Sequence, residues 1–216
     1  MIIVFGNGKG GVGKSFAALN TVVELNDRGY PTALIDGQAG NWPTAKRLML
    51  FDKEIPTFPV GTIRELRQAI SKSADAGYHV VADWAGEMTD EVSELCSLCD
   101  LVMVPFMTGE QEFIQTTDTL TLIRAHQLTR GGKPEAWVFF NKTKKRDASI
   151  KKYRQHLAPL GIPVAETRLR LLDDYRDNRS VMRNEALDDN DAATDFRRLL
   201  DETIMPHLAT AEAANG

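Results

Sequence analysis

The residues best suited to chemistry lie near the start of the chain, where positions 8 to 15 read Gly8-Lys9-Gly10-Gly11-Val12-Gly13-Lys14-Ser15. This stretch has the phosphate-loop spacing G-x-x-x-x-G-K-S, in which glycines allow backbone N–H groups to converge on phosphate oxygens. At this spacing Lys14 reaches the outer phosphates and the Ser15 hydroxyl holds Mg²⁺. We therefore predict a nucleoside triphosphate site formed by the loop and by Phe16, the next residue.

The flanking segments supply the context that a phosphate loop needs. An apolar run at residues 2–5 predicts a strand, and residues 14–28 suit a helix that Gly29 ends. A strand–loop–helix order places the loop at a helix N-terminus, which adds positive electrostatic potential for phosphate. The alternative, a turn that is glycine-rich by chance, requires neither flank.

Strand-like and helix-like segments alternate along the rest of the chain. We expect strands at residues 32–36, 79–83, 101–104 and 136–140, and helices at residues 62–76, 88–98, 112–128, 148–158 and 191–204. Continuous apolar strands alternating with helices predict an α/β fold with a mostly parallel β-sheet covered by helices on both faces. Residues 41–61 and 166–190 have no clear pattern. We expect one domain over residues 1–216, with a frayed tail from about residue 205 to 216.

Several of the predicted strands end in polar residues. Asp36, Asp83 and Asn141 each end a strand, and Pro105 follows another. In an open parallel sheet, ligands bind at the carboxyl ends of the strands. These residues are therefore expected to converge with the phosphate loop on one nucleotide.

Residues 9–15 resemble the deviant Walker A box, K-G-G-x-G-K-[ST], of the ParA/MinD group of ATPases. The resemblance extends to Asp36, to Asp83 as a Walker B-like aspartate, and to residues 99–105, which are similar to the family's D-hydrophobic-P strand. It covers roughly residues 1–200. In its size, and in having no recognisable N-terminal helix-turn-helix region, the chain resembles the short, plasmid-type ParA partition proteins.

This resemblance implies an ATPase of the deviant Walker A phosphate-loop type that uses ATP and Mg²⁺. Lys9 would reach the nucleotide of a facing subunit, giving an ATP-dependent homodimer; the alternative is a solvated loop lysine. Asp83 would act through the outer shell of the metal, and Asp36 would lie near the metal or the attacking water. The expected metal residues are Ser15, Asp36 and Asp83, and the expected catalytic residues are Lys9, Lys14, Asp36, Gln38 and Asp83.

Two positions depart from patterns in related sequences. The family usually has a second acidic residue two positions after the first, where this chain has Gln38. A glutamine orients water but does not take its proton as a carboxylate does, so we expect slow hydrolysis or hydrolysis that waits for a partner. Residues 141–144 resemble the guanine-reading motif N-K-x-D, but Lys144 stands where the carboxylate belongs. Adenine is therefore the expected base, with Asn141 as its contact; the alternative for Asn141 is a turn residue at a strand end.

Positive charge is concentrated in one part of the chain. Residues 142–183 contain twelve Lys or Arg against five Asp or Glu, a net charge of +7, although the whole chain has a net charge of −4. One interpretation is a surface that binds non-specific DNA through phosphates, and the other is a solvated face of surface helices. The candidate DNA contacts are Lys144, Lys145, Arg146, Lys151, Lys152, Arg168, Arg170, Arg176 and Arg179.

The apolar runs, the C-terminal residues and the two cysteines argue against a membrane protein and a metal-cluster protein. No run of 18 apolar residues is present, and the C-terminal residues lack the basic face and bulky apolar anchors of a membrane-binding helix. Cys96 and Cys99 have helical spacing but no second pair, so buried thiols are expected rather than half of a metal cluster. We expect a cytoplasmic, nucleoid-associated protein that acts with a ParB-like partner or a cargo adaptor. The alternatives are a phosphate-loop metabolic enzyme and a nucleotide-dependent protein switch that does not bind DNA.

Overall fold

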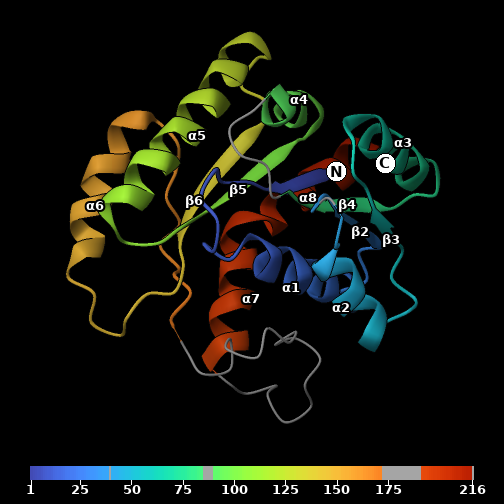
Figure 1. Cartoon of the computed structure of the whole chain (residues 1–216), viewed down its shortest axis with the longest axis horizontal. Coiled ribbons are helices and arrows are strands. Elements are labelled where there is room, and N and C mark those ends of the chain that lie inside the picture. The colour runs from blue at the N-terminus through green and yellow to red at the C-terminus, as the bar shows by residue number, and fades with distance from the viewer. Residues whose placement is uncertain (39, 85–89, 172–190, 216) are drawn as a thin grey trace.

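A computed structural model describes residues 1–38, 40–84, 90–171 and 191–215 of the chain. Six strands form one sheet in the order β3-β2-β4-β1-β5-β6, and every neighbouring pair is parallel (Figure 1). The strands are β1 Ile2–Phe5, β2 Thr32–Asp36, β3 Thr57–Pro59, β4 His79–Asp83, β5 Leu101–Phe106 and β6 Glu135–Phe140. Two parallel bridges, Val138–Val164 and Thr143–Arg170, add extended chain beside β6 and just beyond its end.

The helices connect and cover these strands. They are α1 Lys14–Asp27, α2 Pro43–Phe51, α3 Ile63–Asp75, α4 Asp90–Leu98, α5 Glu110–Thr129, α6 Ser149–Leu157, the 3₁₀ helix η1 Ala158–Leu160, α7 Asp191–Thr203 and α8 Met205–Asn215. At the start of α3 the Thr62 hydroxyl accepts a bond from the Glu65 N–H, which is one half of a capping box. None of the helices in the described part of the chain is both long and apolar enough to cross a membrane.

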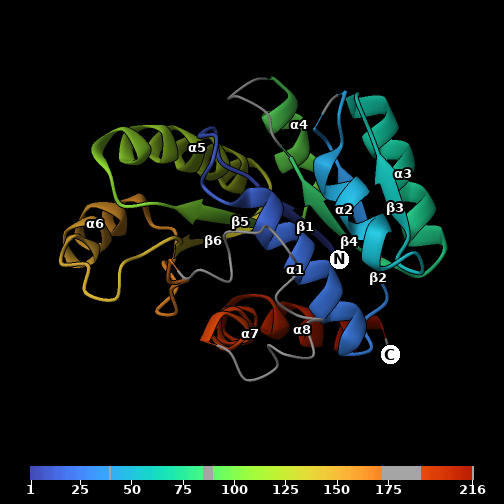
Figure 2. The same ribbon diagram turned by 60° about the horizontal axis from the view of Figure 1, so that its bottom comes forward.

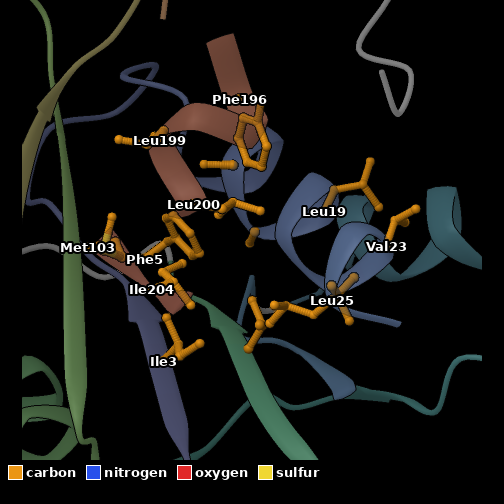
Figure 3. Packing of buried hydrophobic residues seen from close by; sticks show 14 of the residues in the cluster. Ile3, Phe5, Leu19, Val23, Leu25, Met103, Phe196, Leu199, Leu200 and Ile204 are labelled. Atoms are coloured by element: carbon orange, nitrogen blue, oxygen red, sulfur yellow. The ribbon is translucent and has the colours of Figure 1, made fainter. Parts of the chain in front are cut away.

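The two faces of the sheet support two separate hydrophobic cores, because neighbouring strand residues point to opposite faces. Ile3 and Phe5 of β1 pack with α1, α7 and α8, where Phe196 is fully buried (Figure 3). Val4, between them in sequence, belongs to the core formed with α3, α4, α5 and α6. Figure 2 shows α7 and α8 on the side of the sheet opposite α4 and α5. The prediction of a parallel sheet covered on both faces is confirmed.

Three local expectations differ from the structure. Residues 205–216 were expected to fray, but helix α8 begins at Met205 because Leu208 is fully buried in the core with α1 and α7. Pro105 was expected to end its strand, but β5 continues to Phe106. The proline is tolerated because it lies beyond Met103, the last residue of β5 that pairs with β1. The unreadable residues 41–61 contain α2 and the short strand β3.

Candidate active site

The phosphate loop connects β1 to α1 and is held in place by Asn7. The Asn7 Nδ2 donates to the Pro105 carbonyl at 2.8 Å and to the Thr116 hydroxyl at 3.0 Å. Its Oδ1 accepts from the Lys9 N–H at 3.0 Å, and the Gly8 N–H donates to the Thr119 hydroxyl. Sequence reasoning missed Asn7, because its burial and its partners on β5 and α5 are not visible in the sequence.

Gly13 is a position of the loop where the backbone and a neighbouring side chain both require glycine. Its φ is +99°, and a Cβ atom there would lie 2.1 Å from the Nδ2 of Asn141. We predict that Gly13→Ala lowers the free energy of unfolding by about 1–3 kcal/mol, because both the left-handed backbone and the contact become strained. Chemical denaturation measures this change. Gly10→Ala is the matched control, since a Cβ at Gly10 meets no atom within 4 Å; equal losses in the two variants would contradict the prediction.

The Lys14 ammonium lies inside the loop. Its Nζ donates to the carbonyl of Lys9 at 3.0 Å, and the residue is only 8% exposed. Burial lowers the pKa of Lys14, while the nearby Asp83 carboxylate opposes this change. A buried ammonium within the loop is suited to meet phosphate charge, which would favour its protonated form.

Ser15, Gln38, Thr44 and Asp83 form a polar cluster beside Lys14. The Gln38 Nε2 donates to the Ser15 Oγ at 2.6 Å and to the Asp83 Oδ2 at 3.2 Å. The Thr44 hydroxyl donates to the same Oδ2 at 2.7 Å. The other carboxylate oxygen of Asp83, Oδ1, is buried and has no hydrogen-bond partner among the described residues. Thr44 was not singled out from the sequence, because it lies in the stretch without a readable pattern.

Burial raises the pKa of Asp83. Hydrogen bonds from Thr44 and Ser15 lower this pKa, the negative charge of Asp36 raises it, and the charge of Lys14 lowers it. A cation beside Asp83 would favour the ionised carboxylate. The described residues contain no group of three His, Cys, Asp or Glu side chains able to hold a metal. Ser15 Oγ and Asp83 Oδ1 nevertheless suit Mg²⁺, which is usually held by one or two protein oxygens, with waters and phosphates completing the shell.

Asp36 lies next to Asp83, because the two residues are paired in the register of β2 and β4. Its Oδ1 accepts from the Gln38 N–H at 3.0 Å and its Oδ2 from the Ala45 N–H at 2.9 Å. Ala45 lies in the first turn of α2, where backbone N–H groups lack helical partners. Asp36 therefore fixes the start of α2, a structural role in addition to the metal or water contact expected from the sequence.

Asn141 and Lys142, which follow β6, contact the phosphate loop directly. The Asn141 Nδ2 donates to the Val12 carbonyl at 2.7 Å, and its Oδ1 accepts from the Lys142 N–H. The exposed Lys142 ammonium donates to the Gly11 carbonyl at 2.7 Å. Asn141 thus supports the loop, and contact with a base stays a prediction. Lys142 was not among the predicted site residues.

Lys9 points toward α5 of its own chain. Its Nζ lies 3.9 Å from the Oε1 of Glu112, and both side chains are 25% exposed. An ion pair at this distance and exposure contributes about 0–1 kcal/mol. Lys9 can leave Glu112 at little cost, so this contact does not oppose a role in another subunit.

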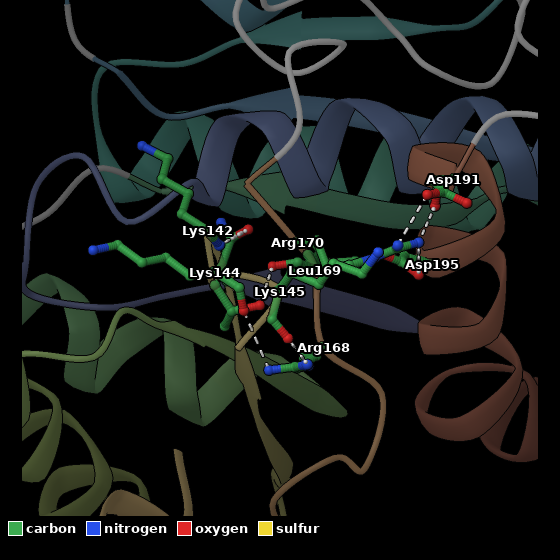
Figure 4. Close-up of polar contacts among 10 residues, drawn as sticks. Lys142, Lys144, Lys145, Arg168, Leu169, Arg170, Asp191 and Asp195 are labelled. Carbon is green, nitrogen blue, oxygen red and sulfur yellow. Dashed lines mark hydrogen bonds and ion pairs between the residues drawn. The ribbon is translucent and has the colours of Figure 1, made fainter. Parts of the chain in front are cut away.

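The predicted DNA contacts fall into distinct environments, and Figure 4 shows four of them: Lys144, Lys145, Arg168 and Arg170. Lys144, Lys145 and Arg146 are exposed on the loop after β6, and Lys151 and Lys152 are exposed on α6. Arg168 donates to the carbonyls of Lys144 and Lys145 and so supports the loop. Arg176 and Arg179 lie outside the described residues.

Arg170 differs from the other predicted DNA contacts within the described residues, because two carboxylates pair with its guanidinium. Its Nε lies 2.6 Å from Asp195 and its Nη1 lies 2.9 Å from Asp191, two residues of α7. Hydrogen bonding to Asp195 raises the pKa of Arg170. The guanidinium therefore links the extended segment that bridges to Thr143 with helix α7. This pairing argues against Arg170 as a DNA contact.

Known proteins provide independent comparisons. Residues 3–187 match the family model described as CobQ/CobB/MinD/ParA nucleotide binding domain. No curated protein sequence matches the chain significantly. The MinD cell division protein of Aquifex aeolicus is 17% identical with a TM-score of 0.66, and the match covers 94% of this chain and 98% of that chain. A ParA family ATPase from Chlorobium tepidum is 13% identical with a TM-score of 0.65, covering 90% of this chain and 95% of that chain.

A third solved structure was obtained with ligands. Cobyrinic acid a,c-diamide synthase from Mycobacterium smegmatis, with a bound ATP analogue and magnesium, is 15% identical with a TM-score of 0.59. The match covers 79% of this chain and 87% of that chain. Because the three structures are at most 17% identical to this chain, their similarity shows a shared fold and no more.

Proposed function

The chain belongs to the CobQ/CobB/MinD/ParA nucleotide-binding family, and from this premise we propose that it is a ParA-like ATPase that positions a plasmid or another cargo. In this proposal ATP with Mg²⁺ drives formation of a homodimer, which holds DNA without sequence preference. A ParB-like protein or a cargo adaptor then stimulates hydrolysis and releases the dimer. The protein would accordingly associate with the nucleoid.

One observation carries the proposal: Lys14 and Ser15, at the start of α1, lie beside Asp83, whose Oδ1 is buried without a hydrogen-bond partner among the described residues. The loop N–H groups and Lys14 would bind the phosphates, and Ser15 and Asp83 would hold Mg²⁺. The ATP analogue and magnesium in the cobyrinic acid a,c-diamide synthase structure support the same ligands here. When bound, Mg²⁺ would neutralise phosphate charge.

The proposed hydrolysis depends on positioning more than on covalent chemistry. Lys14, and Lys9 from the facing subunit, would neutralise charge that develops on the phosphates. The Gln38 amide, beside Ser15, would orient water without accepting its proton as a carboxylate does. Slow hydrolysis that a partner accelerates is consistent with this set of groups.

The exposed lysines after β6 support the DNA part of the proposal. Lys144 and Lys145 are exposed on a loop whose carbonyls Arg168 holds. A preformed loop of this kind can contact phosphates without reading bases. The alternatives, a metabolic enzyme or a switch that binds only proteins, do not require such a surface.

We predict that non-specific plasmid DNA retains the protein with Mg²⁺ and a non-hydrolysable ATP analogue, but not with ADP. Retention should fall steeply with salt, because DNA binding through phosphates releases counterions. Replacing Lys144 and Lys145 together by alanine should lower the salt slope by about 2, since each phosphate contact contributes about one unit. Binding assays between about 50 and 200 mM salt measure the slope.

Lys133→Ala is the matched control, because Lys133 is an exposed lysine before β6 that pairs with Glu135. It should leave the salt slope unchanged. Absence of DNA retention in every nucleotide state would favour the protein switch or the metabolic enzyme. The family description includes CobQ and CobB, which is the observation in favour of the enzyme.

A further inference from the structure

The side chain of Gln38 bridges the two residues that would hold the metal. One amide group donates to the Ser15 Oγ at 2.6 Å and to the Asp83 Oδ2 at 3.2 Å. Thr44 donates to that same Oδ2 at 2.7 Å. The Gln38 amide thus provides the partial positive charge between the hydroxyl and the carboxylate where a divalent cation would bind.

The Gln38 amide nitrogen and a bound cation would share one ligand atom, Ser15 Oγ, and both would lie between that atom and the Asp83 carboxylate. Ser15 Oγ has two lone pairs, and the Gln38 N–H occupies one of them from the side that faces Asp83. A neutral amide also compensates the Asp83 carboxylate only in part, since Oδ1 is buried without a hydrogen-bond partner among the described residues. A divalent cation would provide the missing compensation, so its arrival should displace the amide.

We propose that Gln38 closes the divalent-cation site of the nucleotide-free protein and is displaced when Mg²⁺ arrives with the nucleotide. The inference rests on the proposed function, because it concerns the metal site of that ATPase. It gives Gln38 a part before hydrolysis begins, distinct from orienting water. In this role Gln38 is a positioning residue that sets the affinity of the site for its metal.

The backbone around Gln38 restricts the displacement to the side chain. The Gln38 N–H donates to the Asp36 carboxylate at 3.0 Å, and its carbonyl accepts from the Trp42 N–H at 3.2 Å. The preceding Gly37 donates to the Asp83 carbonyl, and a Cβ there would lie 2.1 Å from the Trp84 ring. Gln38 itself is half-buried, so its side chain has access to solvent into which it can turn. The displacement of Gln38 from the metal site therefore requires only rotation about the torsions of its side chain.

The test is the gain in ADP affinity that Mg²⁺ provides, measured by titration calorimetry with Mg²⁺ and with EDTA. ADP is used because it binds without being hydrolysed. Gln38→Met keeps the approximate length of the side chain and removes its N–H groups, and Gln38→Ala removes the side chain. In both variants we expect the Mg²⁺-dependent gain to rise about 3- to 10-fold over wild type, because the cation no longer displaces a hydrogen-bonded amide.

Asn41→Ala is the matched control, since Asn41 lies in the same loop and its side chain accepts from the exposed Lys46. Asn41→Ala should leave the Mg²⁺-dependent gain unchanged. In EDTA, every variant should bind ADP with the affinity of the wild-type protein. An unchanged or smaller gain in Gln38→Met and Gln38→Ala would overturn the inference while leaving the proposed function intact. Absence of Mg²⁺-dependent ADP binding in the wild-type protein would overturn both.

Discussion

Replacing Lys14 by alanine should weaken ATP binding by about 30-fold or more. Lys14 is the buried ammonium of the phosphate loop, and its Nζ lies 3.0 Å from the Lys9 carbonyl. Truncating one partner of a buried, hydrogen-bonded charge pair costs about 2–5 kcal/mol, and each 1.4 kcal/mol is tenfold in affinity. Titration calorimetry with a non-hydrolysable ATP analogue and Mg²⁺ measures the loss.

Lys46→Ala serves as the control for Lys14, because it removes an exposed ammonium on α2 that bonds to the Asn41 side chain. Its ATP affinity should equal that of wild type. Wild-type affinity in the Lys14→Ala protein would disprove the assignment of the phosphate loop.

Replacing Lys9 by alanine should abolish the ATP-dependent dimer and leave ATP binding by the monomer nearly unchanged. Among the residues that the structure describes, the Lys9 ammonium makes only a 3.9 Å, partly exposed ion pair with Glu112. That pair contributes about 0–1 kcal/mol, so its loss alone has little effect on the monomer. In the proposed dimer the same ammonium would meet the triphosphate of the facing subunit. Light scattering coupled to gel filtration, with ADP and with a non-hydrolysable ATP analogue, reports the dimer.

Glu112→Gln is the matched variant, because it removes the same ion pair and keeps Lys9. It should dimerise at least as well as wild type with the ATP analogue. A normal dimer in Lys9→Ala would show that Lys9 does not act across the subunits, whatever the DNA-binding assay gives.

The parallel sheet was predictable because its inner strands are continuous apolar runs. Strands Thr32–Asp36 and Leu101–Phe106 are buried throughout, and residues 32–36 and 101–104 read as strands without any knowledge of their neighbours. By contrast, α2 begins where Asp36 accepts from the Ala45 N–H, a contact between separate elements. Strand β3 has only three residues. Neither element has enough local pattern to be recognised before the fold is known.

The candidate site divides in the same way. The spacing of Lys14 and Ser15 in the loop reveals their chemistry, whereas Asn7 and Thr44 gain their roles only from partners elsewhere in the chain. Counting charges along the sequence is not enough to identify the residues that contact DNA. Arg170 contributes to the net positive charge of its segment, but Asp195, 25 residues later, lies against it in space. The number of charges along a sequence does not distinguish a basic side chain that is available to a ligand from one that is paired with a carboxylate.

The short strand β3 and the bridges beside β6 also affect how copies of this protein associate. An exposed edge strand invites another chain to extend the sheet, and this leads to aggregation. Here one edge is three residues long and ends in Pro59, which lacks an N–H, and the other edge is partly covered where Val138 bridges to Val164. Sheet extension between molecules is therefore disfavoured at both edges, and self-association has to use helix or loop surfaces.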